Sequence, residues 1–534
     1  MKARVFTNGD FWVTGRNLRR GISLAALDGR IIRIGDYDEC LDAFPRGVKP
    51  EEVDLEGKTV LPGFIDSHIH LLSFGLTLRD ISLADVTSIE QIKAKVRAKA
   101  DTVAEGQWIL GRGWDQEVFA ENRYPTRKDL DEASGGRPVF LTRACGHIAV
   151  ASTKALEIAG ITRDTQDPPG GAIDRDAYGD PTGILRESAL ELVQSHVPPV
   201  SLEVMEDLLK QAMEHALSKG ITTVHTNDGQ AGFTGTMDLY RKVQSQGVPV
   251  RVYWDIPVEF IQDLFETPLR TGDGDDFFRI GAIKLFADGS LGGRTAALEA
   301  PYSDDPDNRG ILVVHEEELK EQVYLAHAQG MQVAVHAIGD RAARVSLEAI
   351  SSAQSRLPAN HIRHRIVHAQ ILSPHIITEM RRVKVVADIQ PKFISTDMRW
   401  AVERVGAARM RSSYSWRTMR RAGIPLAGGS DCPVEPLDPL LGVYCAVTRK
   451  DIDGNPPSGF FPNEKLTLDE AVKLFTLGGA YGAHQEHKKG SLTPGKLCDF
   501  VVLSEDITAV SPDEIKGLEV LLTVVGGEVA YRKP

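Results

Sequence analysis

The middle of the chain alternates short apolar runs with amphipathic stretches, and this alternation restricts the fold more than any other feature of the sequence. The stretches between the runs, such as 201–219 and 316–329, carry apolar residues at helical spacing and end before a glycine. Eight apolar runs qualify as strands: 59–66, 221–226, 250–256, 280–287, 332–338, 364–370, 384–390 and 424–430. Eight successive strand–helix units predict an α/β protein built on a (β/α)8 TIM barrel.

Both ends of the chain are rich in strand-forming residues. Residues 23–36 place two apolar runs around an Asp-Gly turn, and 500–503 and 520–531 have the same texture near the other end. We expect both termini to form one small β-sandwich domain, residues 1–58 plus 488–534, beside a barrel spanning 59–487. The alternative is two independent β-flaps.

Residues 72–200 do not follow the alternation. They contain one more apolar run, 137–146, and a turn-rich segment, 167–183. We interpret 72–200 as an inserted subdomain after the first barrel strand. Loops that follow barrel strands lie on the catalytic face, so an insertion there would roof the active site. The alternative is a separate domain that takes no part in catalysis.

Charge and cysteine usage exclude some partners and environments. A length of 534 residues calls for more than one structural unit, and a net charge of -12 disfavours nucleic acid as the partner. The five cysteines are scattered without a CxxC pair, which favours a reducing compartment. No apolar run resembles a signal peptide or a membrane span. We expect a cytoplasmic protein with a small-molecule substrate; a homo-oligomer is left open.

An HxH pair, His68 and His70, ends the first candidate strand. Residues two apart in a strand point to the same side, so this pair can present two imidazoles to one metal ion. Taken alone, such a pair is better explained as two polar residues on a solvent-facing surface. Its position after the apolar segment LPGFID, at the edge where barrel active sites form, makes the metal interpretation equally good.

Three further residues of metal-binding type end candidate strands in the same way: His336, His368 and Asp431. A buried imidazole or carboxylate needs a hydrogen-bonding partner or an ion. Each of them alone is better explained as a hydrogen-bonded core residue. Their shared place at the same edge of successive strands favours a metal site.

Lys284 lies inside the apolar run IGAIKLFADG. An ammonium group has no lone pair and cannot bind a metal. Either the side chain extends to reach water, or the amine combines with carbon dioxide to form a carbamate, an anionic ligand able to bridge two metals.

Six segments, in this order, resemble motifs of the amidohydrolase superfamily and, within it, of the amidohydrolase-3 (YtcJ-like) group. The segments are PGFIDSHIH (62–70), IKLFADGSLGGRTAAL (283–298), VAVHAIGD (333–340), RIVHAQ (365–370), GGSDCPVEPLDP (428–439) and GSLTPGKLCDFVVL (490–503). The chain is also similar to N-substituted formamide deformylases. The resemblance implies a distorted barrel beside a β-sandwich, with metal ligands on strands one (His68, His70), four (Lys284), five (His336), six (His368) and eight (Asp431). If 137–146 were a barrel strand, Lys284 would move to another strand.

The chemistry that follows is metal-dependent hydrolysis of a carbon–nitrogen bond other than a peptide bond. Two divalent ions, zinc by preference, would share a hydroxide that attacks an amide or formamide carbonyl. His68, His70 and Asp431 would hold one ion and His336 and His368 the other, with carboxylated Lys284 between them. Asp431 would serve as general base and then as general acid. With Lys284 unmodified, a single-metal site is the alternative.

Five further residues are weaker candidates for substrate binding: His147, Trp114, Asp115, Asp288 and Arg294. His147 would hydrogen-bond the substrate carbonyl or be structural. Trp114 and Asp115 would line the pocket, or Trp114 would belong to a core. Asp288 and Arg294 would contact substrate or shape their glycine-rich loop.

Two other functions stay open. One is a deaminase or an ester or lactone hydrolase at the same site, although Lys284 disfavours a deaminase. The other is a non-catalytic scaffold without metals. The chain has no GxSxG, HExxH or Walker A motif, which disfavours serine hydrolases, zincins and P-loop enzymes.

Overall fold

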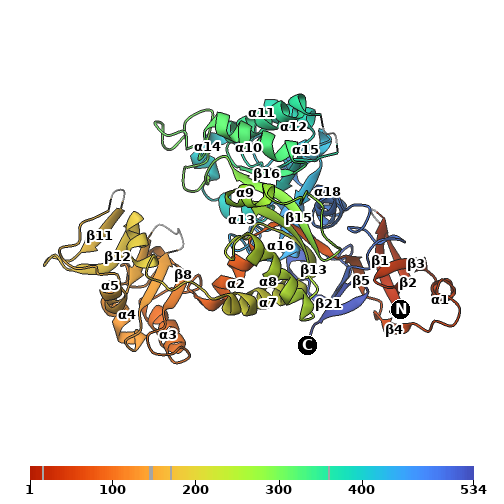
Figure 1. The fold of residues 1–534 in the computed structure, drawn as a ribbon, viewed down its shortest axis with the longest axis horizontal. Coiled ribbons are helices and arrows are strands. Elements are labelled where there is room, and N and C mark those ends of the chain that lie inside the picture. Colours follow the sequence, from red (N-terminus) through yellow and green to blue (C-terminus); the bar gives the residue numbers. More distant parts are fainter. Residues whose placement is uncertain (15–16, 144–147, 169–170, 359–360) are drawn as a thin grey trace. The chain divides into compact units, whose positions relative to one another are not determined.

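The computed structural model describes residues 1–534 except 15–16, 144–147, 169–170 and 359–360 (Figure 1). The chain divides into two compact units. One consists of Met1–Leu72 and Leu209–Pro534, and the other of Ser73–Leu208. The first unit contains two sheets and the second contains one.

An all-parallel sheet of eight strands forms the centre of the first unit. Its strands, in both chain and spatial order, are β6 (Phe64–Ile69), β13 (Ile221–Thr226), β14 (Arg251–Pro257), β15 (Phe278–Phe286), β16 (Val333–Ala337), β17 (Arg365–His368), β18 (Val386–Ile389) and β19 (Leu426–Gly428). The strands form a nearly closed barrel, which confirms the predicted (β/α)8 fold. Lys284 lies on the fourth strand, His336 on the fifth and His368 on the sixth.

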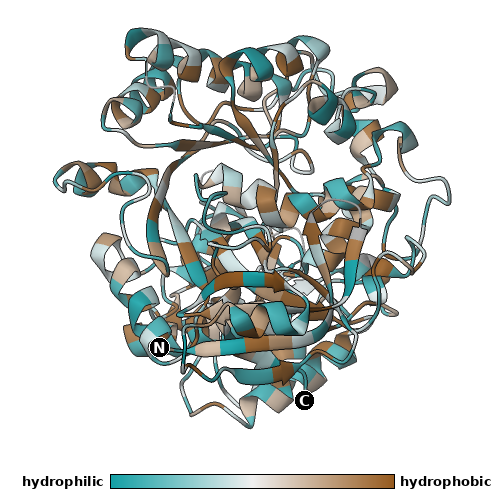
Figure 2. Ribbon diagram, turned by 90° about the vertical axis from the view of Figure 1, so that its right-hand side faces the viewer, coloured by the Kyte–Doolittle hydropathy of each residue, from teal (hydrophilic) through white to brown (hydrophobic). Residues whose placement is uncertain are grey.

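The barrel strands are buried along almost their whole length. Every residue of β6, β13, β14, β17, β18 and β19 is buried. Parallel strands covered on both faces read as continuous apolar runs, which is why the sequence revealed them. Figure 2 shows that the helices mix brown and teal, as expected for helices with one apolar face.

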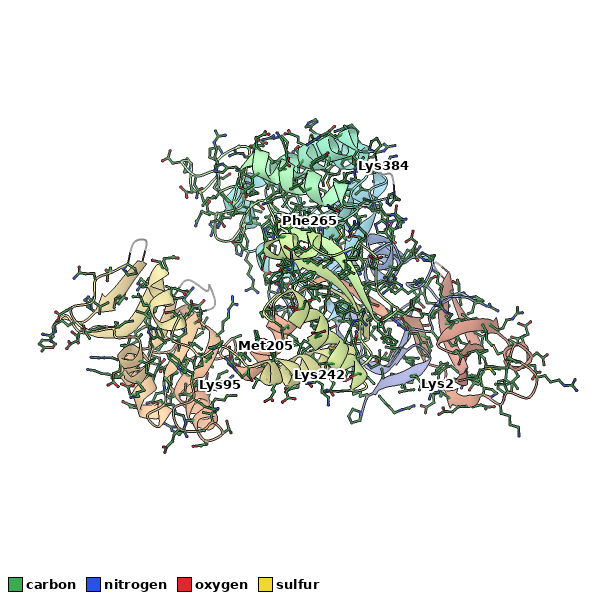
Figure 3. All side chains as sticks on the ribbon, viewed as in Figure 1. Lys2, Lys95, Met205, Lys242, Phe265 and Lys384 are labelled. Atoms are coloured by element: carbon green, nitrogen blue, oxygen red, sulfur yellow. The ribbon has the colours of Figure 1, made fainter. Side chains whose placement is uncertain are left out.

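Helices follow the barrel strands and cover them. The helices of this unit are α1 (Tyr37–Asp42), α8 (Phe233–Ser245), α9 (Ile261–Phe265), α10 (Glu316–Ala328), α11 (Asp340–Arg356), α12 (Pro374–Val383), α13 (Phe393–Asp397), α14 (Ala401–Met410), α15 (Trp416–Arg421), α16 (Pro439–Thr448), α17 (Leu468–Lys473) and α18 (Gly479–Gly482). α12 shows why they begin and end where they do: the Ser373 hydroxyl accepts from the Ile376 N–H, and left-handed Lys384 ends the helix. Lys384 and Lys242 of α8 are exposed (Figure 3).

The predicted strand 59–66 is in fact two strands in two sheets. β5 (Thr59–Pro62) pairs with strands of the terminal sheet, and β6 begins the barrel. Gly63 lies between them, and a Cβ there would lie 2.4 Å from the Thr222 methyl carbon. The change of sheet therefore requires a close approach that only glycine allows.

Both termini contribute to the second sheet, as predicted, so the alternative of separate flaps is wrong. The strands run in the order β22 (Glu528–Arg532), β21 (Val520–Val525), β20 (Phe500–Leu503), β5, β1 (Ala3–Thr14), β2 (Asn17–Leu27) and β3 (Arg30–Gly35), with β4 (Glu51–Asp54) paired to β1. The strands from the two chain termini share one apolar core, in which the Phe6 and Phe500 rings meet edge to face with their centres 4.8 Å apart. The predicted hairpin turns at Asp28 and Gly29, both at positive φ.

The Ser73–Leu208 unit has its own sheet and apolar cores. The sheet runs in the order β11 (Gly171–Arg175), β12 (Pro181–Glu187), β10 (Ile148–Ala151), β9 (Val139–Arg143), β8 (Ile109–Trp114) and β7 (Ile81–Ser82). Its longer helices are α3 (Ile89–Ala100), α4 (Arg127–Ser134) and α5 (Thr153–Ile158); α2 (Leu71–Arg79) and α7 (Leu202–Ser218) connect it to the barrel chain, and α6 (Glu191–Gln194) precedes α7. The apolar run 137–146 therefore supplies β9 and no barrel strand, which leaves Lys284 on strand four.

Among the described residues, none of the helices combines the length and the apolar character needed to cross a bilayer.

Candidate metal centre

The side chains predicted as metal ligands gather where the barrel strands end. His68, His368 and Asp431 each offer a ligand atom within 4.8 Å of the other two. His70 Nε2 lies 3.2 Å from Asp431 Oδ1, and His336 Nδ1 lies 2.9 Å from His368 Nε2. Short contacts thus connect all four histidines and the aspartate.

The backbone is strained at this cluster. His368 and Ala369 have φ values of 74° and 45°, and Asp431 has 56°. Residues other than glycine rarely adopt this left-handed conformation, at a cost of about 1–3 kcal/mol each. Such strain persists where the surrounding structure requires a particular side-chain direction, which supports a functional role for this edge of the barrel.

The hydrogen bonds of His336 and His368 fix which ring nitrogens carry a proton. His336 Nε2 donates to the Gly289 carbonyl at 3.0 Å, and His368 Nδ1 donates to Gln390 Oε1 at 2.7 Å. The unprotonated nitrogens, His336 Nδ1 and His368 Nε2, therefore face each other with their lone pairs. Two facing lone pairs repel unless a cation lies between them. Histidines that bind a metal typically donate their other ring N–H to a carbonyl or carboxylate, as His336 and His368 do here.

Burial keeps the imidazoles neutral. It lowers the pKa of His68 to about 3 and of His336 to about 4, with Lys284 adding repulsion in both cases. Burial alone would raise the pKa of Asp431, but its contacts with His68 and His70 hold that pKa well below the usual range. Neutral imidazoles beside an ionised carboxylate form a donor set suited to zinc.

Lys284 is buried, with an exposed fraction of 1%, so the alternative in which it extends to water is wrong. Its Nζ has no hydrogen-bond partner in the described part of the chain and lies 3.7 Å from the centre of the Phe286 ring. Burial lowers its pKa to about 8. His68 Nδ1 also lacks a hydrogen-bond partner among the described residues, and the polar contacts of Asp431 Oδ1 are with His68 Nε2 at 3.3 Å and His70 Nε2 at 3.2 Å. The imidazole nitrogen and the carboxylate oxygen are atom types that bind a metal ion, whereas the unmodified Lys284 ammonium cannot.

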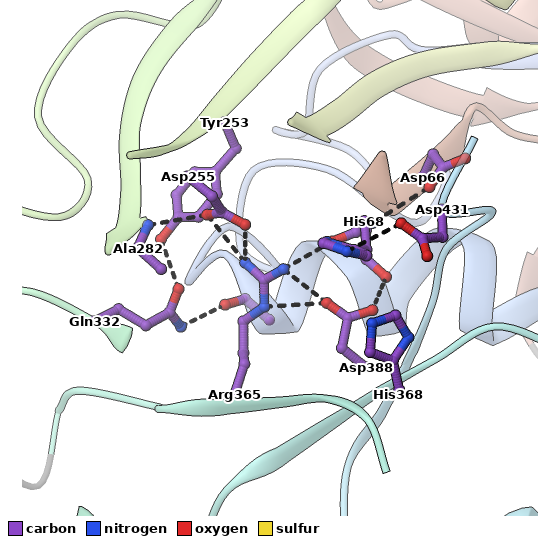
Figure 4. Close-up of polar contacts among 12 residues, drawn as sticks. Asp66, His68, Tyr253, Asp255, Ala282, Gln332, Arg365, His368, Asp388 and Asp431 are labelled. Atoms are coloured by element: carbon purple, nitrogen blue, oxygen red, sulfur yellow. Dashed lines mark hydrogen bonds and ion pairs between the residues drawn. The ribbon is translucent and has the colours of Figure 1, made fainter. Parts of the chain in front are cut away.

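A buried charge network lies one layer deeper in the barrel (Figure 4). The Arg365 guanidinium contacts Asp255 at 2.9 Å and Asp388 at 2.7 Å, all with 0% side-chain exposure. It also donates to the Ser67 carbonyl at 2.8 Å, while the Ser67 hydroxyl donates to Asp388 at 2.6 Å. One guanidinium thereby ties β17 to β14, β18 and β6. We did not predict this network; the only signal in the sequence was a charged residue inside each apolar run.

A second polar group that we did not predict surrounds α13. Glu435 accepts from Lys392 at 3.0 Å and from Thr396 at 2.7 Å, which attaches the loop after Asp431 to α13. Phe393 stacks on the His368 ring at 5.8 Å. These contacts restrain two of the candidate ligands from the side of α13.

Asp397 of α13 accepts hydrogen bonds from Gln370 at 2.6 Å and from Tyr414 at 2.7 Å. Burial raises its pKa to about 7, although the Tyr414 hydrogen bond acts in the opposite direction. Between about pH 4 and 7 the native state therefore holds a proton that the unfolded state has released, and stability falls as the pH rises.

Replacing Asp397 with asparagine removes this titration. We expect the melting temperature of Asp397→Asn, relative to that of the unchanged protein, to rise between about pH 4.5 and 7 and then level off. The control is Asp129→Asn. Burial acts to raise the pKa of Asp129, but its bonds to Arg123 and Thr126 lower it to about 2. The melting temperature of Asp129→Asn relative to the unchanged protein should therefore stay constant over the same pH range. A constant relative melting temperature for Asp397→Asn would contradict the raised pKa of Asp397.

The weaker candidates occupy other environments. Trp114 is fully buried in a core of the Ser73–Leu208 unit and donates to the Leu141 carbonyl, as its core alternative predicted. Asp115 pairs with Arg143. His147 lies outside the described residues.

Asp288 and Arg294 hold the loop after β15. Asp288 accepts the N–H groups of Ala297, Ile338 and Gly339 and lies 3.5 Å from His336 Nε2. Burial raises its pKa to about 7. Arg294 pairs with Asp304 at 3.0 Å. Arg294 therefore has its partner within the loop, and Asp288 joins this loop to the backbone after β16, in keeping with the loop-shaping alternative.

A parallel barrel whose strands end in clustered histidines and an aspartate is an arrangement found in metal-dependent hydrolases. The chain belongs to the amidohydrolase family, because the model of that family matches residues 51–531. It is 36% identical to the putative amidohydrolase YtcJ of Bacillus subtilis over 95% of each chain. It is 27% identical to the N-substituted formamide deformylase of Arthrobacter pascens over 95% of this chain and 94% of that one.

A solved structure supports the same conclusion. The crystal structure of an uncharacterized metal-dependent hydrolase from Pyrococcus horikoshii is 30% identical in sequence, with a TM-score of 0.80. The match covers 96% of this chain and 99% of that one.

Proposed function

We propose that the protein is a metal-dependent amidohydrolase that cleaves an amide or formamide-like carbon–nitrogen bond other than a peptide bond. The facing lone pairs of His336 and His368, next to ionised Asp431, carry the proposal. The deformylase of Arthrobacter pascens, related over nearly the whole chain, supports the choice of bond.

The ligands divide into two groups. His68, His70 and Asp431 would hold one divalent ion, and His336 and His368 the other, with zinc favoured by the imidazole-rich donor set. Lys284, carboxylated at its Nζ, would bridge the two groups, since the unmodified amine has no hydrogen-bond partner among the described residues. The bound metals would supply a water that ionises near neutral pH and a charge that polarises the substrate carbonyl.

The chain's own residues then manage the proton. The Asp431 carboxylate would accept the proton of the attacking water and pass it to the departing nitrogen, which leaves readily only when protonated. Gln390 and the Gly289 carbonyl keep the lone pairs of His368 and His336 directed at the centre. Glu435, held by Lys392 and Thr396, restrains the loop that carries Asp431.

Metal analysis and a substrate screen test the proposal. The purified protein is analysed for metals by mass spectrometry and assayed against N-formyl amines, N-acyl amino acids, cyclic amides and lactones, with and without added zinc. We expect about two equivalents of metal per chain and hydrolysis of an amide or formamide. One equivalent would indicate a single-metal site with unmodified Lys284. No bound metal would favour the scaffold alternative, and cleavage confined to lactones would contradict the proposed bond.

Removal of the metal gives a second prediction. A strong chelator followed by gel filtration should lower the activity on the best substrate by at least about a hundredfold, since the attacking water is no longer activated. Added zinc should restore the activity and raise the melting temperature, because ligands that bind only the native state stabilise it. Full activity of the metal-free protein would contradict a metal-dependent mechanism.

A further inference from the structure

The barrel has one seam, between its first and last strands. Among the strand pairs of the described residues, β6 and β19 form none, although they are the two ends of the sheet. Just beyond β19, the Asp431 N–H donates to the His68 carbonyl at 2.8 Å, and the His70 N–H donates to the Cys432 carbonyl at 2.9 Å. The seam is thus closed at the catalytic end, by the backbone of the candidate ligands.

Glycine makes this approach possible. A Cβ at Gly429 would lie 2.6 Å from the His68 backbone nitrogen, so any larger residue would push the two strands apart. His68 and His70 are on one side of the seam and Asp431 on the other. The group proposed to hold one ion therefore spans the seam, whereas His336 and His368 lie on the neighbouring strands β16 and β17, which pair regularly.

Asp66 bridges the seam with its side chain. Its Oδ1 accepts the Ser430 N–H at 3.0 Å and the His68 N–H at 3.3 Å. One donor belongs to a candidate ligand, and the other belongs to the residue before Asp431. Figure 4 shows Asp66 near His68 and Asp431. Asp66 is fully buried, and no lysine or arginine of the described residues forms an ion pair with it. Its hydrogen-bond partners are thus the His68 N–H and Ser430, the latter through both its backbone N–H and its hydroxyl, which distinguishes Asp66 from Asp255 and Asp388.

We infer that Asp66 is a positioning residue that sets the separation across the seam, so that His68, His70 and Asp431 converge on one ion. This inference rests on the proposed function. It predicts a selective effect: loss of the Oδ1 acceptor should weaken the ion held across the seam and leave the ion held by His336 and His368 in place.

Cobalt(II) titration of the metal-free protein tests the inference, with the visible absorption of the bound ion and the bound stoichiometry as readouts. The variants are Asp66→Ala, which removes the acceptor, and Asp66→Asn, which keeps one. The matched control is Ser152→Ala in the other unit, because the buried Ser152 hydroxyl also accepts two backbone N–H groups, those of Val139 and Ala155. It should lower the melting temperature and leave cobalt binding unchanged.

We expect Asp66→Ala to raise the dissociation constant of one cobalt site by about ten- to a hundredfold, the usual effect of losing a residue that hydrogen-bonds a metal ligand. The dissociation constant of the other site should change by less than about twofold. Asp66→Asn should bind within about threefold of the unchanged protein. Unchanged cobalt binding by Asp66→Ala despite a lower melting temperature would overturn the inference. Equal weakening of both sites, or an Asp66→Asn variant as weak as Asp66→Ala, would overturn it too. If the unchanged protein bound no metal, the proposed function itself would fail.

Discussion

Asp431→Asn is expected to lower kcat by about a thousandfold on the best substrate of the screen, because general acid–base catalysis contributes roughly 10²–10⁴ in rate. Asparagine has nearly the same shape and keeps one oxygen able to bind a metal, but it cannot accept the proton of the attacking water. The measurement is steady-state kinetics at saturating zinc, with the metal content determined on the same sample. Proton transfer and metal binding are thereby separated.

The control for this variant is Asp304→Asn, which changes a partly buried carboxylate that pairs with Arg294 and Arg404 outside the cluster. Its kcat should stay within about twofold, because these ion pairs include none of the candidate metal ligands. Full recovery of the Asp431→Asn variant by excess zinc would show that Asp431 acts only as a ligand. Activity within tenfold of the unchanged protein without added zinc would contradict both roles.

Arg365→Met is expected to cause the largest loss of stability, about 3–5 kcal/mol, because it leaves Asp255 and Asp388 buried with no counter-charge. Methionine roughly fills the volume of the arginine stem, so the loss reports the missing charge and hydrogen bonds more than a cavity. Urea unfolding and calorimetry measure the effect. A second substitution, Asp388→Asn in the Arg365→Met background, should recover part of the loss, since it removes one uncompensated charge.

Arg382→Met is the matched control, because Arg382 forms an exposed pair with Glu379 at 2.7 Å. Exposed pairs contribute about 0–1 kcal/mol, so the melting temperature should barely change. An Arg365→Met variant as stable as this control would show that the network contributes nothing to the barrel.

The sequence was most informative where burial is uniform. The strands of a parallel barrel are covered on both faces, so their apolar runs predicted β13 to β19 closely. It failed at 59–66, because β5 and β6 are equally apolar although they belong to different sheets. The change of sheet at Gly63 depends on the close approach of Thr222, which belongs to a strand distant in sequence.

The candidate ligands were predictable for a related reason. Metal-binding residue types stand directly after apolar runs, and the parallel topology brings all such ends to one edge. The residues that support them were not predictable. Arg365, Asp388 and Asp66 are charged residues within apolar runs, and nothing in the sequence says which charge or backbone group each one meets. For Asp288 the sequence left substrate contact and loop shaping both open, and its observed partners are backbone N–H groups and His336 at 3.5 Å.

The passage of the chain through Gly63 has a consequence for shortened versions of the protein. The last β-rich segment supplies β20, the hydrogen-bonded neighbour of β5, and β5 leads straight into the first barrel strand. Asp499, just before β20, also neutralises the buried Arg251 of β14 at 2.8 Å. Deleting the chain from Asp499 onward would therefore leave the buried Arg251 without its counter-charge. It would also remove the hydrogen-bonded neighbour of β5, the strand that leads into β6 and His68. The C-terminal segment belongs to the same compact unit as the candidate ligands, and its removal is expected to destabilise their arrangement.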